Sequence, residues 1–166
     1  MKNLKSNLMY LANIILGILT YVFLSQSYIG VGVSSYEGYI SGYDTIAHYF
    51  DGNGTQVMIA ISNLLVAILA GLLILSSIYC LLVSLGTVKK SKTFKLMNFA
   101  NIILSLAFVV FSAISLFCTV GLVNDSSGEI FGVSLGSRIG WAVIVNFVLS
   151  ILTLLTSILG SKYSKK

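Results

Sequence analysis

Four long apolar stretches, none of which contains Lys, Arg, Asp or Glu, constrain this chain more than any other feature. They lie near residues 8–25, 57–85, 96–122 and 139–159. A helix needs about 20 apolar residues to cross a hydrocarbon core of about 30 Å. Only 9% of the residues are charged, against about 25% in an average soluble domain. The sequence therefore predicts an all-α membrane protein, a single domain built as a bundle of four transmembrane helices.

The charged residues between these stretches predict the orientation. The loops at 26–56 and 123–138 contain all five acidic residues but only one basic residue, Arg138. The other nine basic residues lie before the first stretch, in the loop 86–95 and after the last stretch. Basic residues are enriched on the cytoplasmic side of membrane proteins. We therefore expect a multi-pass protein of the cell membrane, with both termini and the loop 86–95 in the cytoplasm.

The openings of the first and third stretches resemble each other. Residues 8–16 (LMYLANIIL) and 96–104 (LMNFANIIL) are identical at seven of nine positions, at an offset of 88. We interpret this as a duplicated helical hairpin whose copies are related by an axis along the membrane normal; chance similarity within apolar sequence is the alternative. For the first stretch, a cleaved signal peptide is a second interpretation, and the repeat favours a retained helix.

Each stretch contains one asparagine. An amide within hydrocarbon must find hydrogen-bond partners, and such bonds between helices average about 0.6 kcal/mol. We predict that these side chains form interhelical polar clamps, with a polar path for a solute as the alternative. The four residues are Asn13, Asn63, Asn101 and Asn146.

Small residues predict further close contacts between helices. The two cysteines are expected to remain unpaired, because one lies near the inner end of its span and the other lies near the outer end of a different span. The small residues are Ala67, Gly71, Gly132, Gly136 and Gly140, and the cysteines are Cys80 and Cys118.

The two outer loops differ in length and composition. Alternation of glycine with Ile or Val at 29–33 predicts a strand, residues 130–135 look similar, and the two segments could pair as a small sheet. Ser41-Gly42 and 52–54 are typical of turns, and we expect one or two helical turns from Asp44, as the cap, to Asp51. Tyrosine-rich loops with glycine suit protein recognition, although tyrosine also anchors loops at the membrane interface. The tentative partner-binding residues are Tyr36, Tyr39, Tyr43 and Tyr49.

Catalytic, cofactor and metal sites are not expected. Asp44, His48 and Asp51 would share one helix face and could hold a metal, but a lone histidine is more often an exposed loop residue. No ionisable group accompanies the polar residues within the stretches, which disfavours an enzyme or a proton-coupled transporter. The basic residues flank apolar runs instead of forming a nucleic-acid footprint. Sequons at Asn53 and Asn124 are expected to be unused, because the lysine- and isoleucine-rich composition is typical of bacteria.

Two resemblances add to this picture. With its two hairpins, the segment Tyr39–Asp44 (YISGYD) and the segment 132–136 (GVSLG) before the last stretch, the chain resembles uncharacterised small tetraspan membrane proteins of low-GC Gram-positive bacteria. Its loop layout is similar to that of claudin-type proteins, without the tryptophan and paired cysteines of the claudin first loop. Neither resemblance implies an activity.

From these observations we expect a non-enzymatic scaffold or interaction protein. Its first outer loop would contact a protein, an envelope component or a second copy of the chain, which could also associate through small-residue helix faces. A small oligomeric channel or transport accessory subunit is the alternative. The only other partner expected is membrane lipid.

Overall fold

The computed structural model describes residues 4–33, 36–89, 91–125, 128–130 and 133–164. Within this part of the chain there are five helices and four strands. In order they are α1 (Leu4–Leu24), β1 (Ser27–Val33), β2 (Tyr36–Ser41), α2 (Gly42–His48), α3 (Gly54–Ser84), α4 (Lys92–Asp125), β3 (Gly128–Ile130), β4 (Val133–Ile139) and α5 (Trp141–Ser164).

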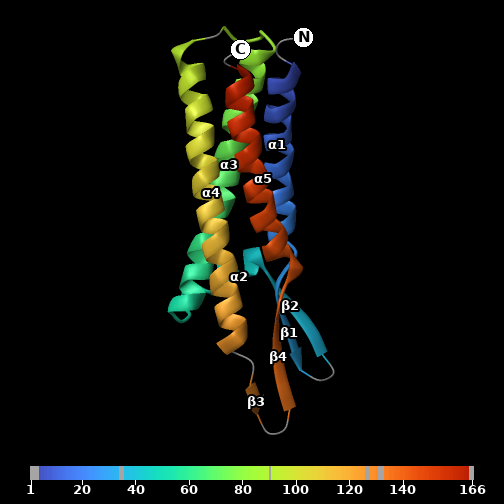
Figure 1. Ribbon diagram of the computed structural model, residues 1–166. Coiled ribbons are helices and arrows are strands. Elements are labelled where there is room, and N and C mark those ends of the chain that lie inside the picture. The colour runs from blue at the N-terminus through green and yellow to red at the C-terminus, as the bar shows by residue number, and fades with distance from the viewer. Residues whose placement is uncertain (1–3, 34–35, 90, 126–127, 131–132, 165–166) are drawn as a thin grey trace.

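The four long helices α1, α3, α4 and α5 form a bundle in which α1 and α4 each pack against both α3 and α5. All four are long and apolar enough to cross a membrane. Both termini lie at one end of the bundle, together with the connection between α3 and α4, and the strands project from the opposite end (Figure 1). We call these the inner end and the outer end. The chain is therefore a multi-pass integral membrane protein.

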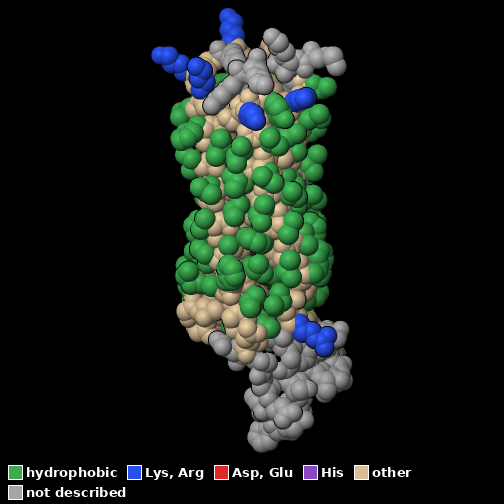
Figure 2. Space-filling view, viewed as in Figure 1, with side chains coloured by type: hydrophobic (Ala, Val, Ile, Leu, Met, Phe, Trp, Pro, Cys, Tyr) green, Lys and Arg blue, Asp and Glu red, His purple; other side chains and the backbone are tan. Residues whose placement is uncertain are grey.

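Apolar side chains form a continuous belt around the bundle in the face shown, and lysine and arginine side chains lie beyond it (Figure 2). Within the bundle the pattern is reversed. The buried face of α1 is largely small or polar, and its residues recur every three or four positions: Ser6, Tyr10, Asn13, Gly17, Thr20 and Leu24. This spacing gives a straight contact stripe, and small residues let membrane helices approach closely.

The helices differ from the predicted stretches mainly at their ends. α4 begins at Lys92 and ends at Asp125, well outside 96–122, because helical structure continues through the polar residues that flank an apolar run. α3 begins where Asn53 and Gln56 form a reciprocal capping box. α5 begins at Trp141 and not at residue 139, because Ile139 ends β4 and pairs with Ile29 of β1.

The outer loops form an antiparallel sheet of order β2-β1-β4-β3. The predicted pairing of the two loops is confirmed, since Ile29, Gly30 and Val33 pair with Ile139, Arg138 and Leu135. Two features were not predicted. The segment 36–41 is the edge strand β2, and the stretch 130–135 contains the end of β3 and the start of β4, with residues 131 and 132 outside the described part.

The short helix α2 follows β2 directly, so the turn predicted at Ser41-Gly42 is wrong. The prediction that Asp44 caps this helix is also wrong. Ser41 is the N-cap, and its hydroxyl oxygen accepts a bond from the Asp44 N–H. Asp44 occupies the third helical position and accepts bonds from both the N–H and the hydroxyl of Ser41. A serine three residues before a carboxylate is a capping box, and it moves the helix start to Gly42.

Candidate functional site

The outer polar layer is the set of buried hydrogen bonds that join α2 and β1 to the bundle, made by Tyr28, Thr45, Asn63, Ser115 and Asn146. The Asn63 amide group donates to the Thr45 hydroxyl of α2 over 2.7 Å. Its oxygen accepts a bond from Ser115 of α4 over 2.6 Å. All three side chains are almost completely buried. One asparagine of α3 therefore holds both the outer helix and the neighbouring membrane helix.

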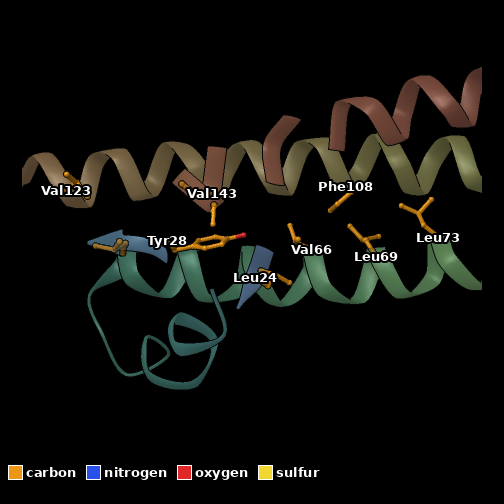
Figure 3. Close-up of a cluster of buried hydrophobic side chains, with 10 residues drawn as sticks. Leu24, Tyr28, Val66, Leu69, Leu73, Phe108, Val123 and Val143 are labelled. Carbon is orange, nitrogen blue, oxygen red and sulfur yellow. The ribbon is translucent and has the colours of Figure 1, made fainter. Parts of the chain in front are cut away.

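Asn146 of α5 makes the second connection in this layer. Its amide group donates to the hydroxyl of Tyr28 in β1. Tyr28 is 1% exposed and extends from the strand into the bundle, where it packs in one cluster with Leu24, Val66 and Val143 (Figure 3). A buried tyrosine needs a partner for its hydroxyl, and Asn146 supplies one. The Tyr28 side chain thus connects the sheet to the membrane helices.

The inner polar layer consists of Asn13, Ser76, Asn101, Thr156 and Ser157. Asn13 of α1 donates to the Ser157 hydroxyl of α5 over 3.0 Å, and its oxygen accepts from Thr156. The oxygen of Asn101 in α4 accepts from Ser76 of α3. Asn63 and Ser76 are 13 residues apart on α3, so the two layers are separated by about 20 Å at 1.5 Å per residue.

The first predicted hairpin contains α1 and α3, and the second contains α4 and α5. Each of the four asparagines bonds to a residue of the hairpin to which it does not belong. Asn13 and Asn101 link helix to helix, and so does Asn63 through Ser115. Asn146 differs, because its described partner is a strand residue and not a helix residue. The serine and threonine partners were not singled out from the sequence, although polar residues at helical spacing within an apolar run are the signal that could have found them.

At the inner end a third connection joins two residues that occupy equivalent positions in the repeat. The Tyr10 hydroxyl donates to the Asn98 oxygen over 2.6 Å, and both side chains are buried. Residues 10 and 98 are 88 apart, which is the offset of the repeat. The first position is a tyrosine, which donates the bond, and the second is an asparagine, which accepts it.

Two glycine sites show how closely the elements approach. A Cβ at Gly71 would lie 2.9 Å from the Tyr21 hydroxyl, and this hydroxyl donates to the Ala67 carbonyl over 2.6 Å. The small-residue face at Ala67 and Gly71 is thus occupied by α1 of the same chain. Gly140 lies against β1, and its N–H donates to the Tyr28 carbonyl over 2.7 Å. Residue 132 lies outside the described part, and Gly136 belongs to β4, where it pairs with Gly32 of β1.

The four tyrosines predicted to bind a partner occupy different environments. Tyr39 in β2 is 65% exposed and Tyr43 in α2 is 40% exposed. Tyr49 follows α2 and packs against the buried cluster, and this burial raises the pKa of its hydroxyl. Tyr36 belongs to β2, but its side chain lies outside the described part. Of these four tyrosines, Tyr39 and Tyr43 are the two whose described side chains are exposed.

The side chain of Asp44 belongs to the N-terminal cap of α2. Asp44 is engaged by Ser41, and these hydrogen bonds hold the pKa of its carboxyl below the ordinary value. In the described residues no group of three or more His, Cys, Asp or Glu side chains is arranged to hold a metal ion. Cys80 and Cys118 are free thiols.

Comparisons with known proteins leave the chain without an assigned family. No family model, no curated protein and no solved structure matches it. The resemblances to small Gram-positive tetraspan proteins and to the claudin-type layout therefore stay predictions.

Proposed function

We propose that this protein is a non-enzymatic membrane interaction protein. The outer cap, defined as β2, β1, β4, β3 and α2, presents Tyr39 and the free edge of β2 to a protein or envelope partner outside the cell. By the distribution of lysines, both termini then lie in the cytoplasm. The observation that carries the proposal is the exposed edge strand with Tyr39, held on a membrane bundle by buried bonds.

The edge strand suits recognition because of its backbone. β2 pairs with β1 on one side, and on its other side no strand is paired within the described part of the chain. The outward N–H and C=O groups of an edge strand can bind an extended segment of another protein. Tyr39 adds a large, rigid and amphipathic surface, which is the kind of side chain that recognition sites favour.

The outer cap is also held firmly enough to present a defined surface. Thr45 of α2 and Tyr28 of β1 are each bonded to an asparagine of the bundle. Gly140 ties β1 to the start of α5. A partner that binds a pre-organised surface loses less conformational entropy on binding.

Tyr43 has a different role in this proposal. Its hydroxyl donates to the carbonyl of Tyr21 near the end of α1 over 3.4 Å. Phe23 and Trp141 pack edge to face at the same end of the bundle, with ring centroids 5.4 Å apart. Aromatic residues gather where hydrocarbon meets water. We assign Tyr43 to this interfacial belt and Tyr39 to the partner surface beyond it.

The test is site-specific photocrosslinking in the native host. A benzophenone amino acid at position 39 should give a discrete adduct, and the same group at Leu75, which is 66% exposed on α3, should not give that adduct. The adduct should disappear when the untagged wild-type protein is present in excess. Crosslinking at position 39 to lipid alone would contradict the proposal.

A channel is the second candidate function, and one observation favours it. Ser, Thr and Asn side chains line the buried faces of all four long helices, and among the described residues the hydroxyls of Ser77 and Ser112 and the oxygen of Asn146 have no hydrogen-bond partner. The scaffold is favoured because Asn13, Asn63 and Asn101 are already bonded.

Solute flux into proteoliposomes separates the two candidates. A scaffold shows no flux above that of empty vesicles, and the Asn63→Leu and Asn146→Leu variants do not change this. Flux in the wild type that either substitution alters, in a variant that still folds, would establish the channel instead.

A further inference from the structure

Lysines surround the inner end of the bundle. The lysine rim consists of Lys5 on α1, Lys89 after α3, Lys92 and Lys95 on α4, and Lys162 on α5, all of which are exposed. All five acidic residues of the chain lie in the segments 26–56 and 123–138, at the other end. The positive charge of the rim therefore has no carboxylate side chain nearby to balance it.

The lysines stand one helical turn beyond side chains that face lipid. Lys92 precedes Leu96 by four residues, and Lys95 precedes Phe99 by four, so each pair shares a helix face. Leu96 is 64% exposed and Phe99 is 61% exposed. Ile158, which is 44% exposed, and Lys162 repeat this arrangement on α5. Long lysine side chains in this position extend along apolar surface and place the ammonium group in the headgroup region.

The lysines of α4 do not serve the stability of their own helix. Lys92 and Lys95 lie in the first turn of α4, which has no acidic residue. The positive end of the helix dipole disfavours cations there. An external anion at headgroup level removes this repulsion, whereas a more distant acidic protein would not contact the exposed apolar side chains beside the lysines.

We propose that the lysine rim binds the headgroups of anionic phospholipids in the leaflet at the inner end. The ammonium groups contact lipid phosphates from the perimeter of the bundle, and the neighbouring apolar side chains contact the acyl chains of the same lipids. This surface is separate from the outer cap, and the proposal does not depend on the partner proposed there.

The experiment uses the purified full-length chain in nanodiscs, where both leaflets have the same composition and insertion orientation does not affect the result. Electron spin resonance of spin-labelled phosphatidylglycerol and phosphatidylcholine measures the relative association of the two lipids. We expect selection of phosphatidylglycerol at low salt and its loss in 1 M NaCl. Each lysine near an anionic surface contributes up to about fivefold.

Charge variants assign the effect to the rim. The K89Q/K92Q/K95Q protein should lose most of the selection, and K89R/K92R/K95R should retain it. R138Q, which removes the one basic residue of the outer segments, is the matched control and should leave selection unchanged. Circular dichroism confirms that each variant is folded, which exposed lysines allow.

Three outcomes would overturn the proposal. Equal association of both lipids in the wild type shows that the rim does not select anionic headgroups. Equal selection by the wild type and the glutamine variant assigns the effect to another surface. If 50 mM inorganic phosphate abolishes the selection while sodium chloride of the same ionic strength does not, the rim binds free phosphate and not lipid.

Discussion

The two polar layers of the bundle use the same residue type for different purposes. In the inner polar layer, Asn13 and Asn101 join membrane helix to membrane helix. In the outer polar layer, Asn63 reaches α2 as well as α4, and Asn146 reaches β1. The inner asparagines therefore connect membrane helices to each other, and the outer asparagines also attach the outer cap to the bundle.

This difference shows how a bundle in which α1 and α4 bury equivalent positions supports an asymmetric cap. The six buried positions of α1 correspond, at the offset of 88, to buried positions of α4. The duplicated hairpin stays a prediction, which this shared buried face and the Tyr10–Asn98 bond support. At the outer end each loop contributes two strands and the first loop adds α2, and the outer asparagines bond to Thr45 of α2 and Tyr28 of β1.

The largest expected effect comes from filling the junction between the cap and the bundle. A Cβ at Gly140 would lie 2.1 Å from the Ser27 carbonyl oxygen, and backbone atoms cannot move aside as a flexible side chain can. We expect Gly140→Ala to lower the free energy of unfolding by about 3 kcal/mol, measured in mixed micelles titrated with SDS.

Gly121→Ala is the control for that substitution, because a Cβ there meets nothing within 4 Å. Alanine favours helix over glycine by about 1 kcal/mol, so this variant should be as stable as the wild type or more stable. Equal losses at both glycines would show that the contact at Gly140 is unimportant.

A smaller effect should separate the two polar layers. Asn63→Leu removes bonds to Thr45 and Ser115, and Asn101→Leu removes the bond to Ser76. Each substitution should cost about 1 kcal/mol. Amide hydrogen exchange should rise in α2 only for Asn63→Leu. Faster exchange in α2 for Asn101→Leu as well would mean that the layers are not independent.

The smallest effect concerns pH. The Asp44 carboxyl has a folded-state pKa below its ordinary value of 3.8, chiefly because the Ser41 N–H and hydroxyl donate to it. Its contribution to stability is therefore present above about pH 4 and is lost as the pH falls through the lowered pKa. The protection factors of the α2 amides, which correct for the intrinsic pH dependence of exchange, should fall below pH 4 in the wild type, and Asp44→Asn should remove that dependence. An unchanged pH profile in the variant would assign the effect to another carboxyl.

The sequence was most informative where one local property decides the structure. The runs around Asn13, Asn63, Asn101 and Asn146 predicted four helices, because apolar length alone determines a membrane span. The alternation at 29–33 predicted β1, and the pairing of the two loops was anticipated. β2 was not predicted, because its short, mixed composition has no clear period, and the cap of α2 was predicted at Asp44 although it is Ser41.

The candidate site was less accessible from sequence. The exposed Tyr39, the buried Tyr28 and the packed Tyr49 come from one tyrosine-rich loop, and composition cannot separate them. Their difference arises from which residue of the loop faces the end of the bundle. Likewise, the sequence identified Asn146 but not its partner Tyr28, which is 118 residues away.

By itself the sequence determined the four membrane helices, the end at which the lysines gather and the presence of an amide in each helix, since these follow from hydrocarbon thickness and the cost of charge within it. Only the tertiary structure decided which side chains satisfy those amides and which tyrosines remain exposed. Hydrogen-bond partners depend on how helices distant in sequence come together, and that arrangement is set by packing, not by local composition.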